Sequence, residues 1–178
     1  LSSKFGESIY DTAIIDKIVN KCKQSNLLNL VGFHCHIGSN INNPKYFKKA
    51  TLTMLNFVKE VSDRNNYQFN VLNLGGGFGI KYLDSDDEID VVKMLNVINK
   101  TIDKYLKENN LDIKEVMIEP GRSIVGDSGF TLYNVGSVKK TYGGKQYVFV
   151  DGWMTDNIRP ALYQASYTCD ICNNMETD

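Results

Sequence analysis

Apolar residues at helical spacing alternate along the chain with short, continuously apolar runs. The first helical stretch covers residues 9–24, where an apolar residue recurs at every fourth position: Tyr10, Ile14, Ile18 and Cys22. This spacing predicts an amphipathic helix with that stripe on its apolar face. Asn43 before Pro44 is typical of a helix start, and the helical pattern that follows continues to about Arg64.

A third helix is predicted to begin within the acidic run at residues 84–88. Ser85 and Glu88 have the spacing of a capping box, and the acidic side chains would lie in the first turn, where the helix dipole favours negative charge. Beyond this run, apolar residues follow one helical face: Val91, Leu95, Ile98, Ile102 and Tyr105.

Three short apolar runs, centred near Val31, Val71 and Val116, alternate with the helices. This order predicts right-handed βαβ units and a parallel sheet covered by helices. Unusual residues directly follow each run: His34, His36, Gly38 and Ser39, then Gly75, Gly76 and Gly77, then Glu119 and Arg122. Because active sites in such sheets gather at the carboxyl ends of strands, we expect three loops to face one site.

The pattern changes after residue 128. Alternating apolar and polar residues on both sides of Gly143 and Gly144 predict an antiparallel hairpin. We therefore expect an α/β unit at residues 1–128 and the start of an antiparallel β-domain at residues 129–178. A complete eight-stranded α/β barrel needs about 250 residues, so we expect the chain to be a piece of a longer protein.

Composition narrows the range of partners. Hydrophobic residues make up 42% of the 178 residues and charged residues 23%, as in a globular protein with a sizeable core. The 20 basic and 21 acidic residues nearly cancel, so no electrostatic field favours nucleic acid or an anionic membrane. No apolar run approaches the roughly 18 residues of a membrane span, and the first residues lack a signal-peptide pattern. We expect a cytoplasmic protein.

The candidate site residues also have structural interpretations. Glycines 75–77 offer backbone amides that can surround a phosphate, but they equally suit a tight turn, and they lack the lysine and hydroxyl group of a P-loop. The two histidines could face a ligand, pack as neutral side chains in the core, or form half of a metal site. No Asp or Glu accompanies them at a ligand spacing, which disfavours a metal. Cys169 and Cys172 lack the second cysteine pair of a typical zinc site.

Charged residues leave similar alternatives open. Glu119 at the end of an apolar strand is costly unless a cation meets it, and that cation is either part of a ligand or Arg122 of the same loop. Arg159 and Tyr163 lie four positions apart, so on a helical segment they share a face that suits a carboxylate ligand. The alternative for Arg159 is a surface salt bridge.

Four motifs, in this order and at these separations, resemble the fold type III decarboxylases that depend on pyridoxal 5′-phosphate: HCHIGS, LNLGGGFG, EPGRS and DGWMTDNIRPALY. The resemblance covers essentially the whole chain. It implies the C-terminal part of an alanine racemase-like (β/α)8 TIM barrel, followed by the start of an antiparallel β-domain. Within the family, the chain is most similar to the branch that decarboxylates meso-2,6-diaminopimelate to L-lysine and CO2 in lysine biosynthesis.

The same resemblance implies a role for each loop. His36 would stack on the cofactor ring, and Glu119 would keep the ring nitrogen protonated, so these two residues are the expected catalytic pair. The other expected cofactor-binding residues are Ser39, Gly75, Gly76, Gly77, Pro120, Gly121 and Arg122. Arg122, Arg159 and Tyr163 would hold the carboxylates of a small amino-acid substrate. Members of the family are homodimers that share the active site.

Three alternatives stay open within this interpretation. Decarboxylases for ornithine, arginine or carboxynorspermidine share the first three motifs, although Arg159 and Tyr163 favour a substrate with a second carboxylate. A racemase of related fold would pair the ring nitrogen with arginine rather than with Glu119. The third alternative is a non-catalytic homologue that binds a partner or a phosphorylated ligand.

The chain also departs from the family pattern. Trp153 stands where the family usually has a small residue. The lysine that binds the cofactor covalently belongs to an earlier strand, and Lys4 matches a later loop, so we expect Lys4 to be structural. Neither Cys169 nor Cys172 matches the motif of the family's catalytic cysteine. We therefore expect these 178 residues alone to be inactive.

Overall fold

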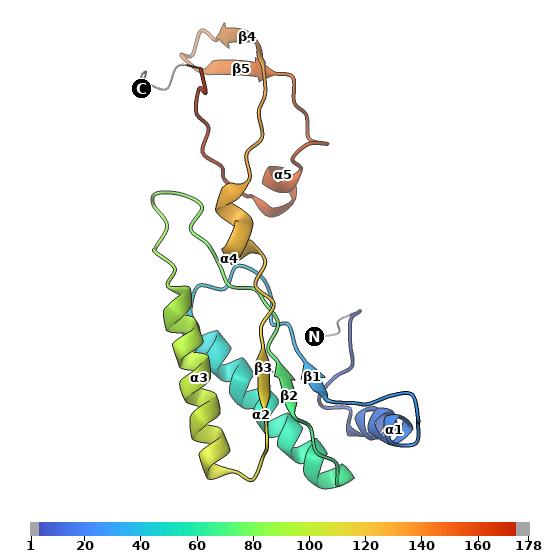
Figure 1. Ribbon diagram of the computed structural model, residues 1–178. Helices are drawn as coiled ribbons and strands as arrows, with labels where there is room; N and C mark the ends of the chain where they lie inside the picture. Colours follow the sequence, from blue (N-terminus) through green and yellow to red (C-terminus); the bar gives the residue numbers. More distant parts are fainter. Residues whose placement is uncertain (1–3, 174–178) are drawn as a thin grey trace. The chain divides into compact units, whose positions relative to one another are not determined.

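The computed structural model describes residues 4–173 and divides into two compact units. The first unit comprises residues up to 80 together with 89–126, and the second comprises 81–88 together with the residues from 127 onward. The elements of the first unit are α1 (Thr12–Lys23), β1 (Gly32–His34), α2 (Pro44–Asn65), β2 (Val71–Asn73), α3 (Val91–Glu108), β3 (Glu115–Met117) and α4 (Arg122–Val125) (Figure 1).

The three strands of the first unit form a parallel sheet in the order β1-β2-β3. Phe33, Leu72 and Val116 are partners across its middle row, and His34 pairs with Asn73 and Asn73 with Met117 in the next row. The parallel α/β arrangement predicted from the sequence is confirmed. In-register parallel strands bring their carboxyl ends to one edge, where the three loops begin.

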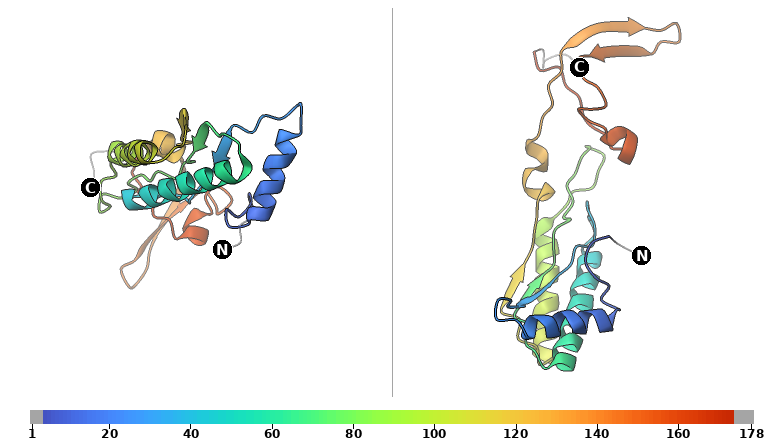
Figure 2. Two further views of the ribbon diagram at one scale, coloured as in Figure 1. Left: turned by 90° about the horizontal axis from the view of Figure 1, so that it is seen from below. Right: turned by 90° about the vertical axis from the view of Figure 1, so that its right-hand side faces the viewer.

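Helices α2 and α3 lie along one face of this sheet (Figure 2). α2 begins as predicted, because the Asn43 side chain accepts a hydrogen bond from the N–H of Lys45 at 3.0 Å and Pro44 occupies the first helical position. Fully buried side chains from the helices and from β2 with its flanking residues form the core: Phe47, Leu55, Val58, Phe69, Leu72, Met94 and Ile98. Burial of each such side chain stabilises the fold by about 1.5–3 kcal/mol. This core holds β2, and with it the loop that follows β2, in place.

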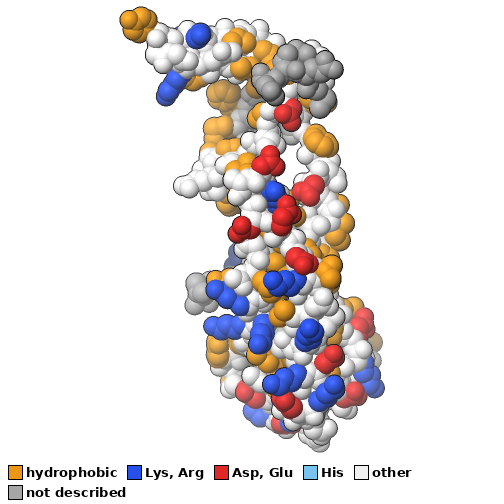
Figure 3. All heavy atoms as spheres, turned by 90° about the vertical axis from the view of Figure 1, so that its left-hand side faces the viewer, with side chains coloured by type: hydrophobic (Ala, Val, Ile, Leu, Met, Phe, Trp, Pro, Cys, Tyr) orange, Lys and Arg blue, Asp and Glu red, His pale blue; other side chains and the backbone are white. Residues whose placement is uncertain are grey.

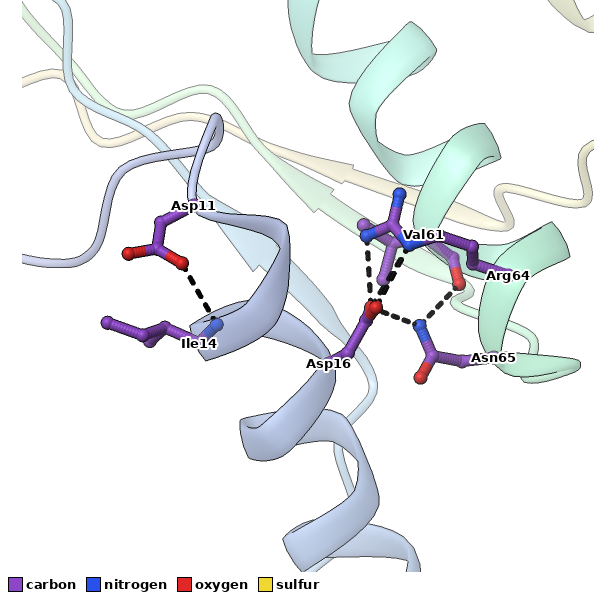
Figure 4. Close-up of polar contacts among 6 residues, drawn as sticks. All are labelled: Asp11, Ile14, Asp16, Val61, Arg64 and Asn65. Atoms are coloured by element: carbon purple, nitrogen blue, oxygen red, sulfur yellow. Dashed lines mark hydrogen bonds and ion pairs between the residues drawn. The ribbon is translucent and has the colours of Figure 1, made fainter.

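A polar junction joins α1 to α2 (Figure 4). The Asp16 carboxylate accepts hydrogen bonds from Nε of Arg64 at 3.0 Å and from Nη2 at 2.9 Å. It also accepts one from Nδ2 of Asn65 at 2.7 Å. Together these bonds fix the rotation of α1 about its axis.

That rotation buries a different stripe of α1 from the predicted one. Ile15 and Val19 are buried, whereas Tyr10, Ile14 and Ile18 are exposed. The prediction was wrong because two apolar stripes run side by side on this helix. Burial of Ile15 and Val19 in the core selects this stripe, and the polar junction at Asp16 is formed in the same orientation.

The predicted start of the third helix was also wrong. α3 begins at Val91, and its N-cap is Asp90, whose side chain accepts a hydrogen bond from the N–H of Lys93 at 2.8 Å. The acidic run before it forms a turn instead, in which the Asp86 carboxylate accepts the N–H groups of Tyr82 and Leu83. An aspartate that caps a local turn competes with helix formation, which the capping-box spacing alone does not reveal.

The second unit contains the hairpin expected from the sequence. β4 (Val135–Lys140) pairs antiparallel with β5 (Gln146–Val150), and Gly144 in the connecting turn has φ of 80°. A positive φ favours glycine there. A short 3-10 helix, η1 (Gly126–Ser128), precedes the hairpin, and α5 (Arg159–Tyr163) follows it.

Charged side chains of both signs are interspersed over the first unit on the face drawn in Figure 3. This distribution fits the near-zero net charge of the sequence, a formal −1. Within residues 4–173, no helix is both long and apolar enough to span a membrane.

Candidate active site

The loops that follow the three parallel strands are in contact with one another through glycine. A Cβ atom at Gly75 would overlap the carbonyl oxygen of Cys35, and one at Gly77 would overlap the carbonyl oxygen of Gly38. A Cβ atom at Gly76 would overlap the carbonyl oxygen of Glu119. Backbone approaches this close are possible only for glycine, so the three consecutive glycines allow the three loops to contact one another.

Glu119 is held where these loops meet. Its Oε1 accepts a hydrogen bond from Nδ2 of Asn73 at 2.7 Å, and its Oε2 lies 3.3 Å from Nε2 of His34. Its backbone N–H donates to the carbonyl of Gly75 at 2.8 Å. The carboxylate therefore has partners from the ends of both β1 and β2. Arg122, which the sequence offered as an alternative partner, begins α4 three residues later.

The Glu119 carboxylate is accessible as well as fixed. The exposed fraction of its side chain is 55%, and that of His34 is 50%. A carboxylate offers about four lone-pair positions; one accepts the hydrogen bond from Asn73, and His34 lies at ion-pair distance from the other oxygen. The remaining positions can accept a hydrogen bond from a ligand.

His36 and Ser39 lie on the loop after β1. Both are exposed, and Nδ1 of His36 lies next to Gly75, at 3.2 Å from the position a Cβ atom would take there. The Ser39 hydroxyl and the backbone N–H groups of Gly76 and Gly77 donate no hydrogen bond to any residue in the described part of the chain. These donors suit an anionic ligand such as a phosphate.

Cys35 lies between the two histidines, and its thiol is unreactive. Burial raises the pKa of its thiol to about 11, so little thiolate is present at neutral pH. Within residues 4–173, no group of three or more His, Cys, Asp or Glu side chains is arranged to hold a metal ion.

The second unit brings Arg159 and Tyr163 together on α5, on the shared face that their spacing predicts. The Arg159 guanidinium carbon lies 5.9 Å from the centroid of the Tyr163 ring. Nε of Arg159 is buried and has no hydrogen-bond partner among the described residues. An unpaired buried donor is costly, so this guanidinium suits an acceptor supplied by a ligand. Trp153 in the same unit is 76% exposed, and Cys169 and Cys172 are exposed free thiols.

A comparison with protein families identifies this architecture. Residues 1–126 match the model of the pyridoxal-dependent decarboxylase, pyridoxal binding domain. This match covers the whole of the first unit and all three converging loops. The chain belongs to this family.

Curated members of the pyridoxal-dependent decarboxylase family extend the similarity beyond residue 126. The chain is 42% identical over 173 residues to the diaminopimelate decarboxylase of Bacillus subtilis, an alignment that covers 97% of the chain and 39% of the relative. It is also 42% identical over 174 residues to that of Staphylococcus aureus, with 98% of the chain and 40% of the relative covered. The chain thus spans about two fifths of the length of these curated relatives.

Solved structures show the same fold. The diaminopimelate decarboxylase of M. jannaschii has a TM-score of 0.81 and 31% identity over 92% of the chain and 36% of that structure. The enzyme of Helicobacter pylori, solved in complex with L-lysine, has a TM-score of 0.79 and 27% identity over 98% of the chain and 41% of that structure.

Sequence reasoning for this family member missed one site residue and left another undefined. Asn73 was not singled out, although an amide side chain in the apolar run VLNL, two positions before the first glycine, is a detectable signal. His34 had no defined role, and the structure places it against Glu119. Sequence spacing shows that loops converge, but not which side chains touch within them.

Proposed function

We propose that this chain is part of a pyridoxal 5′-phosphate-dependent diaminopimelate decarboxylase, a lyase that converts meso-2,6-diaminopimelate to L-lysine and CO2. The observation that carries the proposal is the Glu119 carboxylate, fixed and accessible where three loops meet. The identity to curated diaminopimelate decarboxylases over nearly the whole chain supports the choice of substrate.

The loops after β1 and β2 offer hydrogen-bond donors and a planar ring that suit the phosphate and the pyridine ring of the cofactor. Ser39 and the amides of Gly76 and Gly77 offer unused hydrogen-bond donors to the phosphate, with Gly75 completing the loop between them and β2. His36 beside Gly75 provides an exposed planar ring that can stack on the pyridine. The remaining contacts would come from the loop of Pro120, Gly121 and Arg122.

Glu119 has the central chemical role in this proposal. When bound, pyridoxal 5′-phosphate accepts the electron pair that departing CO2 leaves behind. The Glu119 carboxylate would keep the ring nitrogen protonated, because a nearby negative charge favours the protonated form. His36 would stack on one face of the ring and shield that face from water.

Arg159, Tyr163 and Arg122 act on the substrate. The unpaired buried Nε of Arg159 suits the carboxylate at the end of the substrate remote from the scissile bond. Tyr163, beside that guanidinium, adds a phenolic donor. Binding at the remote carboxylate orients the scissile bond and disfavours substrates that lack this group.

The same proposal extends to the architecture. Residues 1–128 would form part of an alanine racemase-like (β/α)8 barrel and residues 129–178 the start of its β-domain. In β3, Val116 and Met117 are apolar but 40% and 42% exposed, which supports further chain packing against this strand in the longer protein. The enzyme would be a cytoplasmic homodimer that shares its active site, as expected from the family.

The test is CO2 release by the protein expressed from its complete gene and loaded with pyridoxal 5′-phosphate. We expect release from carboxyl-labelled meso-diaminopimelate in preference to ornithine, arginine and carboxynorspermidine. Glu119→Ala should keep the cofactor bound and lower CO2 release by roughly 100-fold or more. Release from ornithine, arginine or carboxynorspermidine alone would reassign the substrate. Absence of cofactor binding would favour a non-catalytic homologue.

A further inference from the structure

His34, Asn73 and Glu119 lie at or just after the carboxyl ends of three adjacent parallel strands. His34 ends β1 and pairs in register with Asn73, which ends β2, and Glu119 follows β3 by two positions. Partners in register, and residues two apart on a strand, project from the same face of a sheet. The side chains of all three residues therefore meet above one edge of the sheet.

Asn73 connects two loops, and its orientation is fixed. Its Nδ2 donates to Oε1 of Glu119 at 2.7 Å, while its Oδ1 accepts the backbone N–H of Gly75 at 2.9 Å. Exchange of the amide oxygen and nitrogen would place oxygen against oxygen and N–H against N–H, so only one orientation satisfies both partners. Asn73 thus couples the position of the Glu119 carboxylate to the glycine loop.

His34 approaches the other carboxylate oxygen. Its Nε2 lies 3.3 Å from Oε2 of Glu119, so the two carboxylate oxygens face different partners. One partner alone would allow the carboxylate to rotate about its last bond, whereas two partners on separate strands restrict that rotation. Neither partner closes the site, because the side chain of Glu119 remains 55% exposed.

We propose that His34 and Asn73 are positioning residues that orient the Glu119 carboxylate so that its remaining acceptor positions face the ring nitrogen of the cofactor. This inference rests on the proposed function and goes beyond it, because it assigns two residues that act on the cofactor only through Glu119. Loss of either residue leaves the carboxylate in place but poorly aligned. The ring nitrogen is then less completely protonated, and the chemical step slows.

The experiment uses the protein from its complete gene, loaded with pyridoxal 5′-phosphate that is ¹⁵N-labelled at the ring nitrogen. In His34→Leu and in Asn73→Leu, we expect the ¹⁵N chemical shift to move toward that of the unprotonated ring. We expect kcat for meso-diaminopimelate to fall roughly 10-fold to 100-fold, the effect of removing a polar partner of a charged group, with KM unchanged. His34→Gln retains an N–H donor and should recover most of kcat and the original shift.

Asn96→Leu on the exposed face of α3 is the matched control, and it should leave the shift and kcat unchanged. A merely structural role would lower the yield of folded protein without moving the ring-nitrogen shift of the protein that folds. An unchanged shift and kcat in His34→Leu, with an active wild type, would overturn this inference alone. A wild type that does not bind the cofactor would overturn the proposed function and this inference with it.

Discussion

Gly76 lies directly against the backbone of Glu119. A Cβ atom at Gly76 would overlap the Glu119 carbonyl oxygen, and the carbonyl carbon would lie 3.1 Å from it. Gly76 does not have the positive φ of Gly75 and Gly77, so crowding alone requires glycine at this position. The two residues belong to loops after neighbouring strands, and the close approach of their backbones places Glu119 in the site.

Gly76→Ala should therefore separate these two loops. Overpacking of this kind destabilises proteins by typically about 1–3 kcal/mol, and the shift of the Glu119 loop should also weaken binding of pyridoxal 5′-phosphate. Urea unfolding and cofactor titration measure the two effects. Gly129→Ala is the control, since a Cβ atom at Gly129 meets no atom within 4 Å. Equal stability and cofactor affinity of both variants would contradict the importance of the close approach.

The start of α3 gives a second prediction. Asp90 caps the helix through the N–H of Lys93, whereas Ser85 lies in the preceding turn. Asp90→Ala should lower the free energy of unfolding by about 1 kcal/mol, the usual cost of losing an N-cap. Ser85→Ala should be close to neutral. Urea unfolding distinguishes the two, and a larger effect at Ser85 would restore the helix start predicted from the sequence.

Elements with one strong pattern could be predicted from the sequence. The helix capped by Asn43, the parallel sheet and the hairpin at Gly144 all have the predicted type and place. Predictions failed where two local patterns competed. On α1, two apolar stripes lie side by side. Before α3, the capping-box spacing of Ser85 and Glu88 competes with the turn at Asp86 and with the Asp90 cap.

The Asp16 junction should make stability depend on pH. The Arg64 guanidinium, and then the Asn65 amide, hold the pKa of Asp16 below its ordinary value. A depressed folded-state pKa stabilises the fold above the unfolded pKa, which is about 4, and this stabilisation is lost as the pH falls through the folded-state pKa. The ion pair also raises the pKa of Arg64 above its ordinary value, in agreement with this direction.

We therefore expect Asp16→Asn to unfold at a lower urea concentration than the wild type at pH 7. The difference should shrink as the pH falls below about 4, the unfolded pKa, and toward the lower folded-state pKa, through which the wild-type carboxylate becomes protonated. Asp103→Asn, at an exposed position of α3, is the control and should match the wild type at pH 7 and below pH 4 alike. A difference between Asp16→Asn and wild type that stays constant with pH would show that packing, rather than charge, holds the junction.

The location of the candidate site could be predicted from the sequence, but the contacts between its side chains could not. The glycine triplet, the paired histidines and the carboxylate that follow three apolar runs are visible as residue types, and parallel strands require them to lie at one edge. The partners of Glu119 are not visible in this way, because Asn73 and His34 reach it across strands separated by whole helices. Such contacts depend on the register of the sheet, which spacing alone does not give.

Arg159 gives the sharpest prediction about the substrate. Its Nε is buried without a hydrogen-bond partner among residues 4–173, so the guanidinium retains an unsatisfied donor that a carboxylate would satisfy. Arg159→Lys replaces a planar pair of donors with a single ammonium group that cannot bind a carboxylate in bidentate fashion. In the protein from its complete gene, KM for meso-diaminopimelate should rise roughly 10-fold to 100-fold, the effect of losing one charge-assisted hydrogen bond. Lys140→Ala on exposed β4 should leave KM unchanged, and the same KM in Arg159→Lys as in wild type would exclude Arg159 from substrate binding.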